Sequence, residues 1–310
     1  YSNKGIDKTI ALMEQAYNEK PFKKFYIYSI KTDTDAGFQR ILSDTASKTE
    51  IRDVFYIEES ESAAGYTIAD KIASLKAAVA DNYEQATPRN VWVIPYGTLS
   101  EAVTDATNVA PEATIVTQFT TLTTPTGSGR LGLIMPDLNI AGAIMGKIIG
   151  RNYDEEIGHE QLNIAVESLT YNFTDSQMLT LLNAGVTFVR KERVNGISGY
   201  RIVAGVSTSF KESAADGLLI SRSIADELLR QVRYAAEVEL KSKETKNAIV
   251  YLQTECNSII ADFVANNDVI AAGTKLTVSE SSTPYTINIA GTIQPVGTIL
   301  MINVDATINA

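Results

Sequence analysis

The sequence predicts a two-domain α/β protein, with a parallel-type sheet domain over residues 1–150 and an α+β domain with terminal β-strands over residues 151–310. The first half alternates helical and extended hydrophobic patterns, as parallel sheets do. The second half holds two long amphipathic helical patterns and then short alternating runs typical of strands. A chain of 310 residues with 45% hydrophobic content is long enough for two cores.

The first domain is predicted from hydrophobic spacing and from β-branched or aromatic runs. A continuous apolar run at 91–94 is typical of a strand covered on both faces. The polar segment 151–161 indicates a surface connection and places the domain boundary. The predicted helices are 6–16, a polar run from Asp33, 67–83 and 140–149. The predicted strands are 25–30, 54–57, 91–94, 114–119 and 131–135.

The second domain opens with the segment 166–172 and continues with helices and strands of clearer pattern. Gly185 follows the first helix, at the position where a left-handed C-terminal cap favours glycine. A turn at Asn195-Gly196 is predicted to join the first two strands. The predicted helices are 175–183, 220–232 and 249–263. The predicted strands are 186–191, 200–206, 275–279 and 285–293.

The last residues of the chain form one more predicted strand with a single apolar face. A strand of this kind needs a partner, and a free strand edge can pair with another chain. The sequence therefore predicts an assembly arm. Its apolar face is Leu300, Ile302, Val304, Ala306 and Ile308.

Composition excludes several partners. With 27 Lys and Arg against 37 Asp and Glu, the net charge is −10, which removes the counterion-release term that drives nucleic-acid binding. No apolar run approaches the roughly 20 residues that cross a bilayer, so no membrane insertion is expected. The single cysteine, Cys256, excludes a disulfide-stapled or zinc–cysteine architecture. The first residues lack an initiator Met and the apolar core of a signal peptide, so missing N-terminal elements are expected.

Catalytic and cofactor motifs lack their required context. The glycine spacing at 127–132 matches a dinucleotide fingerprint, but a strand and not a helix is predicted after it. His159 is the only histidine, which excludes a two-histidine zinc site, and no Gly-x-Ser-x-Gly elbow accompanies it. Cys256 lies on an apolar helical stripe and is expected to be a buried, inert thiol. We therefore expect no enzyme activity, no catalytic residues, no cofactor and no metal.

Two groups of charged residues have open interpretations. The acidic clusters Asp154-Glu155-Glu156 and Glu58-Glu59 with Glu61 could supply an acid–base pair or a cation site, or be solvated surface. The basic residues of the long helices could be a solvated face or a surface that meets an acidic patch on a neighbouring copy. These residues are Arg222, Arg230, Arg233, Lys241, Lys243 and Lys246.

Three segments of the second half follow each other in a recognisable order. The run Leu179-Thr-Leu-Leu-Asn-Ala-Gly-Val-Thr-Phe-Val-Arg190 matches a helix ending in Leu-Asn-x-x-Gly-Ile/Val before a strand. The run Gly199-Tyr-Arg-Ile-Val-Ala-Gly-Val-Ser-Thr208 matches a next strand with a Gly-x-x-Thr element, and Ala141 to Arg151 matches an Ala-Gly helix before both. This pattern resembles that of the contractile tail sheath family of phages and related injection machines, and the resemblance covers roughly Asn139 to Ala310.

Two departures from the family pattern occur. Ser207 stands where the family usually has Arg, and Val203-Ala204 replaces an aromatic residue that often precedes the glycine. The resemblance implies a first domain like subtilisin without its active site. It also implies a virion-tail subunit, assembled in the host cytoplasm, that stacks as rings around a tail tube protein and contributes terminal strands to its neighbours.

Two other functions remain open on the sequence alone. One is an α/β enzyme or small-ligand-binding protein that uses the carboxyl ends of the first-half strands, near Ser29 to Thr34 and Pro95 to Thr98. The other is a different tail or capsid component with a similar β-rich terminus.

Overall fold

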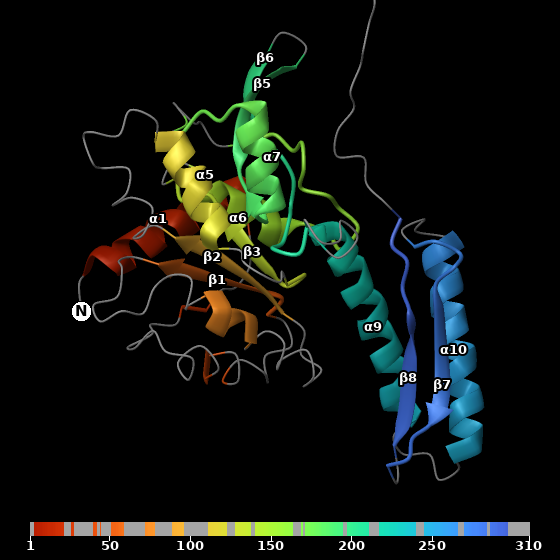
Figure 1. Cartoon of the computed structure of the whole chain (residues 1–310). Coiled ribbons are helices and arrows are strands. Elements are labelled where there is room, and N and C mark those ends of the chain that lie inside the picture. The colour runs from red at the N-terminus through yellow and green to blue at the C-terminus, as the bar shows by residue number, and fades with distance from the viewer. Residues whose placement is uncertain are drawn as a thin grey trace, which may run out of the picture. The chain divides into compact units, whose positions relative to one another are not determined.

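The computed structural model describes most of the predicted elements and leaves several segments outside its description. The described residues are 3–21, 26–27, 40–41, 44, 51–58, 72–77, 89–95, 111–122, 128–137, 140–163, 169, 171–194, 197–210, 217–239, 245–265, 270–283 and 286–296. The mixed α/β class predicted from the sequence is confirmed (Figure 1).

Residues of the chain group into two compact units, Tyr1–Leu219 and Ile220–Ala310. This division falls later than the boundary expected near Arg151. The difference has a physical reason, because strand β4 (Val186–Thr187) joins the sheet of the first unit by pairing with β3 (Leu131–Ile134). The predicted surface connection is also anchored to the first unit, where Arg151 and Ile157 are buried.

A four-stranded parallel sheet forms the centre of the first unit, in the order β1-β2-β3-β4 (Figure 1). The predicted strands at 54–57, 91–94 and 131–135 are confirmed as β1 (Asp53–Glu58), β2 (Asn90–Pro95) and β3. Every residue of β2 is buried, as expected for a strand covered on both faces. Gly132 of β3 leaves room for the ring of Trp92, which would lie 2.3 Å from an added Cβ.

Helix α1 (Asn3–Glu19) packs closely against α6 (Ala141–Gly150), and both were predicted. Glycines of α6 permit this approach. A Cβ added at Gly142 or Gly146 would lie 2.4 Å from the carbonyl oxygen of Leu12 or of Ala16. The spacing of these glycines places them on one face of the helix, so they form the surface on which α1 lies.

The predicted strand at 114–119 is wrong, because this segment is helix α5 (Pro111–Leu122). The β-branched run suggested a strand, but Ile115 and Phe119, four residues apart, are the residues it buries. The threonine hydroxyls bond within the helix, as when Thr117 Oγ1 donates to the Ala113 carbonyl at 2.9 Å. Helix α5 packs against α7 (Asp175–Asn183), and this tertiary contact outweighs local β-propensity.

Helix α7 and the residues after it follow the prediction in part. Thr174 caps the helix with a capping box, and Gly185 ends it with φ +72°. The predicted strand 186–191 divides into β4, which joins the parallel sheet, and β5 (Val189–Val194). Strand β5 forms an antiparallel hairpin with β6 (Ile197–Ile202), so the second predicted strand begins and ends earlier than expected.

The second unit contains the two predicted long helices and a β-hairpin. Helix α9 (Leu219–Glu239), whose first residue ends the first unit, buries Ile224, Leu228 and Val232. Helix α10 (Thr245–Ala265) packs along β7 (Lys275–Glu280), which pairs antiparallel with β8 (Ile287–Thr292) (Figure 1).

Several predicted elements lie wholly or mostly outside the described residues. They are the strand 25–30, the polar helix from Asp33, the helix 67–83 apart from helical residues 72–77, most of 166–172, the turn at 195–196 and the terminal strand 300–308.

Candidate functional site

The two sequence runs that carry the family resemblance meet in space. Gly185 lies against Thr208, whose Cα would be 2.5 Å from an added Cβ. The backbone N–H of Thr208 donates to the Leu131 carbonyl at 2.7 Å, and its hydroxyl donates to the Ser128 carbonyl at 3.2 Å. Thr208, the last residue of the Gly-x-x-Thr element, therefore bonds its segment to the start of β3. Gly185, which has no Cβ, leaves room for Thr208.

Ser207, which departs from the family pattern, fits a buried polar position. Its side chain is buried, and its hydroxyl lies 3.1 Å from that of Ser209. Its N–H donates to the Gly217 carbonyl at 2.7 Å. A serine pair here satisfies its own hydrogen bonds without a charge.

A buried ion cluster centres on Asp53, at the first residue of β1. The Asp53 carboxylate lies 2.8 Å from Arg52 Nε and 3.5 Å from Arg151 Nη1, and it accepts a hydrogen bond from the Trp92 indole at 3.1 Å. Burial alone would raise the pKa of Asp53, but the Arg151 and Arg52 guanidiniums and the Trp92 indole hold it below its ordinary value. Asp53 is therefore ionised at neutral pH.

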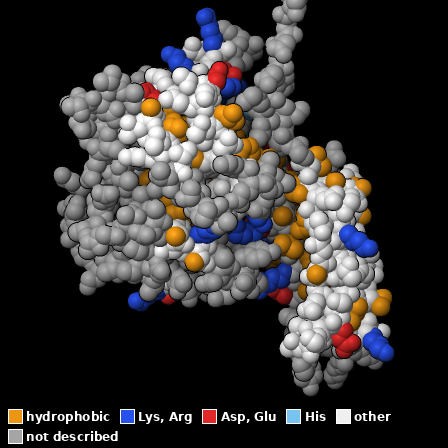
Figure 2. Space-filling view, viewed as in Figure 1, with side chains coloured by type: hydrophobic (Ala, Val, Ile, Leu, Met, Phe, Trp, Pro, Cys, Tyr) orange, Lys and Arg blue, Asp and Glu red, His pale blue; other side chains and the backbone are white. Residues whose placement is uncertain are grey.

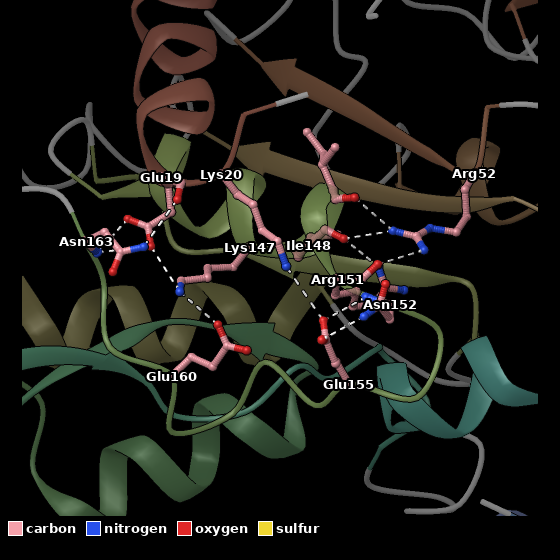
Figure 3. A network of polar contacts seen from close by, with 11 residues as sticks. Glu19, Lys20, Arg52, Lys147, Ile148, Arg151, Asn152, Glu155, Glu160 and Asn163 are labelled. Atoms are coloured by element: carbon pink, nitrogen blue, oxygen red, sulfur yellow. Dashed lines mark hydrogen bonds and ion pairs between the residues drawn. The ribbon is translucent and has the colours of Figure 1, made fainter. Parts of the chain in front are cut away.

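Arg52 also ties the sheet to the C-terminal end of α6. Its Nη2 donates to the carbonyls of Ile148 and Ile149 at 3.0 and 3.2 Å, and its Nη1 donates to that of Arg151 at 3.3 Å (Figure 3). Carbonyls at a helix C-terminus lack intrahelical partners and carry partial negative charge. A cation at this position therefore caps α6 and joins it to β1.

A second cluster joins α1, α6 and the connecting segment 151–163. Lys147 Nζ lies 3.1 Å from Glu19 Oε1 and 2.8 Å from Glu160 Oε2, and the Glu19 side chain is fully buried (Figure 3). Burial opposes the charge on Lys147, but hydrogen bonds to Glu160 and Glu19 raise its pKa above the ordinary value. Glu19 also accepts the Asn163 N–H at 2.8 Å. The cluster therefore joins α1 to α6 and to the segment that follows α6, which are both more than 100 residues away from α1 in the sequence.

Within the acidic cluster Asp154-Glu155-Glu156, the side chains of Glu155 and Glu156 lie in different environments. Glu155 contacts Asn152 and lies 3.7 Å from Lys20, so it is a surface residue (Figure 3). Glu156 Oε1 instead accepts the N–H groups of Gly158 and Gly205 at 2.8 and 3.2 Å, while its enclosed Oε2 has no hydrogen-bond partner among the described residues. The carboxylates of Glu155 and Glu156 therefore stabilise local turns, and they do not face each other as an acid–base pair would.

Replacing Glu156 with Gln is expected to flatten the dependence of stability on pH. Burial raises the pKa of Glu156. A raised carboxyl pKa contributes stability that is present below the unfolded-state pKa and is lost as pH rises through the folded-state pKa. The variant should therefore match the parent in thermal midpoint near pH 4 and exceed it at pH 7. A variant less stable than the parent at pH 7 would contradict this account.

The candidate nucleophiles are not brought together. Cys256 is buried in α10, and burial, with Glu255, raises the pKa of its thiol. His159 is exposed in the first unit, in a turn with φ +62°, and its N–H donates to the Ile202 carbonyl at 2.7 Å. Ser128 precedes β3 in a turn. In the described part of the glycine-spaced motif, the turn leads into a strand, as expected, and not into a helix.

Within the described residues, no group of three or more His, Cys, Asp or Glu side chains is arranged to hold a metal ion. None of the helices in these ranges combines the length and the apolar character needed to span a bilayer.

The three arginines predicted as an assembly face differ in surroundings. Arg230 pairs with Glu227, and Arg233 pairs with Glu237 at 3.3 Å, both within α9 and both half-exposed or more. Arg222 lies nearer the start of the helix and is only partly exposed. Because two of the three cations are matched by carboxylates of the same helix, their net positive field is small.

Helices α9 and α10 also expose apolar side chains. Tyr234 and Val238 of α9 are 67% and 69% exposed, and Val250 of α10 is 68% exposed. Figure 2 shows hydrophobic side chains on the surface of the second unit, with few charged groups among them. Uncovered apolar area of this kind is typical of contact surfaces.

No family model matches the sequence, and no curated protein matches it. Solved structures do match the fold. A chain in the cryo-EM structure of the anti-feeding prophage baseplate, six-fold symmetrised, aligns over 97% of this chain and 80% of its own length, with a TM-score of 0.64 and 12% identity.

Two sheath structures give similar results. The anti-feeding prophage helical sheath in its contracted state aligns over 98% of this chain and 86% of its own length, with a TM-score of 0.59 and 14% identity. The contracted sheath complex of the extracellular contractile injection system PVC aligns over 75% and 68%, with a TM-score of 0.55 and 9% identity. The chain therefore has the fold found in these contractile injection system structures, over the first half as well as the second.

Proposed function

We propose that this chain is a structural subunit of a contractile sheath, which polymerises around a tube of another protein and contracts to drive that tube through a cell envelope. The observation that carries the proposal is the match of 98% of the chain to a helical sheath. Its work is mechanical and not catalytic. Its partners are further copies of itself and a tail tube protein, in a tail-like particle assembled in the cytoplasm of the producing cell.

Strand exchange through the β7–β8 hairpin is the proposed link between copies. Leu276 and Val278 of β7 are buried, whereas Ile287 and Ile289, their neighbours on the same face of β8, are only partly buried. The apolar face of the hairpin is therefore incomplete at β8. The terminal run 300–308 has an apolar face with the period of a strand and would extend this surface when supplied by another copy.

Contraction in this proposal is a rearrangement of subunits that remain linked. Such a motion requires each subunit to contain a rigid domain. The Asp53 and Lys147 clusters stiffen the first unit, because they join α1, α6, β1 and the segment 151–163 through buried charges. The arginines Arg222, Arg230 and Arg233 are proposed as a second contact, of smaller effect because two of them already have partners in α9.

Replacing Ile302 with Pro is expected to abolish polymerisation while leaving the two units folded. Proline removes the backbone N–H of residue 302, a hydrogen-bond donor that the proposed arm offers to the strand beside it. The control is Ile302→Val, which keeps both the N–H and the apolar side chain. Sedimentation measures assembly, and circular dichroism measures folding. A proline variant that polymerises like the parent would overturn the arm, and one that unfolds would assign the strand to its own subunit's core.

A further inference from the structure

The hydrogen-bond pattern of the β7–β8 hairpin determines which backbone groups face outward. The Ser281 N–H donates to the Thr286 carbonyl at 3.1 Å, which makes this pair a hydrogen-bonded one at the turn end of the ladder. In antiparallel strands hydrogen-bonded and non-hydrogen-bonded pairs alternate. Val278 pairs with Ile289 in the register and therefore belongs to a non-hydrogen-bonded pair, whose N–H and C=O groups point away from the partner strand.

The outer edge of β7 is already occupied by a side chain of α10. Gln253 Oε1 accepts the Val278 N–H at 2.8 Å, and Gln253 Nε2 donates to the Leu276 carbonyl at 3.0 Å. These are the two groups that an added strand would bind opposite Thr277. The primary amide of Gln253 thus takes the place of a peptide group of a neighbouring strand, and Asn257 Oδ1 accepts its other N–H at 3.1 Å.

The outer edge of β8 differs. By the same alternation, the N–H and C=O groups of Ile287, Ile289 and Gly291 point away from β7. Among the described residues, no strand pairs with this edge. It also borders the partly buried side of the apolar face, so an incoming strand would gain backbone hydrogen bonds and cover Ile287 and Ile289.

We infer that Gln253 closes the outer edge of β7, so that a strand from a second copy is added at β8 and not at β7. The inference rests on the proposed strand exchange and gives it a direction. A hairpin with two open edges could accept strands on either side and could assemble in more than one way. When the β7 edge is closed, a strand can be added only at β8, and assembly through β7 is excluded. Natural sheets restrict edge pairing in the same way.

The contact itself is tested on the full chain at a concentration below that of polymerisation. In Gln253→Ala, the Val278 amide should exchange with solvent about tenfold faster, the loss expected for one hydrogen bond. The amides paired between β7 and β8 should be unchanged, and Thr254→Ala, an exposed neighbour on α10, should alter none of them. Unchanged exchange at Val278 would overturn the inference.

The direction of strand addition is tested by disulfide formation in a Cys256→Ser background. Cysteine is placed at Ala290 of β8 or at Thr277 of β7, which are exposed and directly opposite each other. A second copy carries cysteine at Met301, Asn303 or Asp305, on the polar face of the arm. Adjacent strands lie about 4.8 Å apart, within disulfide reach, whereas the next strand lies about twice as far.

We expect intermolecular disulfides with Ala290→Cys and none with Thr277→Cys, and additional Thr277→Cys products once Gln253 is replaced by Ala. Disulfides at Thr277→Cys while Gln253 is intact would overturn the inference and leave strand exchange standing. Polymers without a disulfide at either site would overturn both the inference and the arm, while the sheath function would stand. Failure of the unmodified chain to polymerise would instead refute the proposed function.

Discussion

Replacing Asp53 with Asn is expected to lower the free energy of unfolding of the first unit by about 3 kcal/mol. The substitution keeps the shape of the side chain and an oxygen that can accept from Trp92. It removes the carboxylate that lies 3.5 Å from Arg151, whose side chain is 1% exposed and on which the Glu156 carboxylate acts more weakly. An uncompensated buried cation is costly, because its hydration is lost without an ion pair. The fluorescence of Trp92, the only tryptophan, follows unfolding of this unit in denaturant.

The matched control is Asp154→Asn, an exposed carboxylate in the same unit, which should change stability little. The pH dependence gives a second check. A lowered carboxyl pKa contributes stability that is present above the unfolded-state pKa and is lost as pH falls through the folded-state pKa. The difference between Asp53→Asn and the parent should therefore shrink in acid. Equal destabilisation by both variants would contradict the role of the cluster.

Replacing Lys147 with Met is expected to cost the first unit about 3 kcal/mol, because the fully buried Glu19 carboxylate would lose its ion pair with the Lys147 ammonium (Figure 3). Methionine keeps the apolar length of the lysine stem. The same denaturant titration measures the loss. Lys20→Met is the control, since Lys20 is 45% exposed and its contact with Glu155 is 3.7 Å long.

A double variant separates charge from packing. Adding Glu19→Gln to Lys147→Met removes the buried charge and keeps an oxygen that can accept the Asn163 N–H. The double variant should recover a large part of the lost stability, because the fully buried charge at residue 19 is gone and the Glu160 carboxylate, which also loses Lys147, is 37% exposed to water. A double variant less stable than Lys147→Met alone would show that packing and not charge dominates this contact.

Elements with a strong local pattern were predictable from the sequence, and the exceptions have a physical explanation. The continuous apolar run of β2 and the spaced stripes of α1, α9 and α10 appear as predicted, because burial on both faces or on one stripe leaves a direct trace in the sequence. Helix α5 was missed because its β-branched residues favour a strand locally. Its packing against α7, distant in the sequence, decided otherwise.

The buried charge clusters could not be found from local sequence. Arg52 and Arg151 are far apart in the chain and meet only because β1 starts near the C-terminal end of α6. Lys147 is the one charged residue in the sequence of α6, and its partners come from two other segments. One feature of the packing was visible in the sequence, because the spacing of the glycines in α6 indicates that another helix packs closely against it. The edge contact of Gln253 left no trace, because exposed and edge-binding glutamines look alike in a sequence.

Negative-stain electron microscopy of the purified chain over rising concentration tests the central claim most directly. A sheath subunit that carries both its strand and its acceptor edge should form rings or hollow cylinders built from repeated copies. We expect such particles for the parent and for Ile302→Val, and single subunits for Ile302→Pro. A parent chain that stays folded and monomeric at every concentration would contradict the proposal that this protein is a sheath subunit.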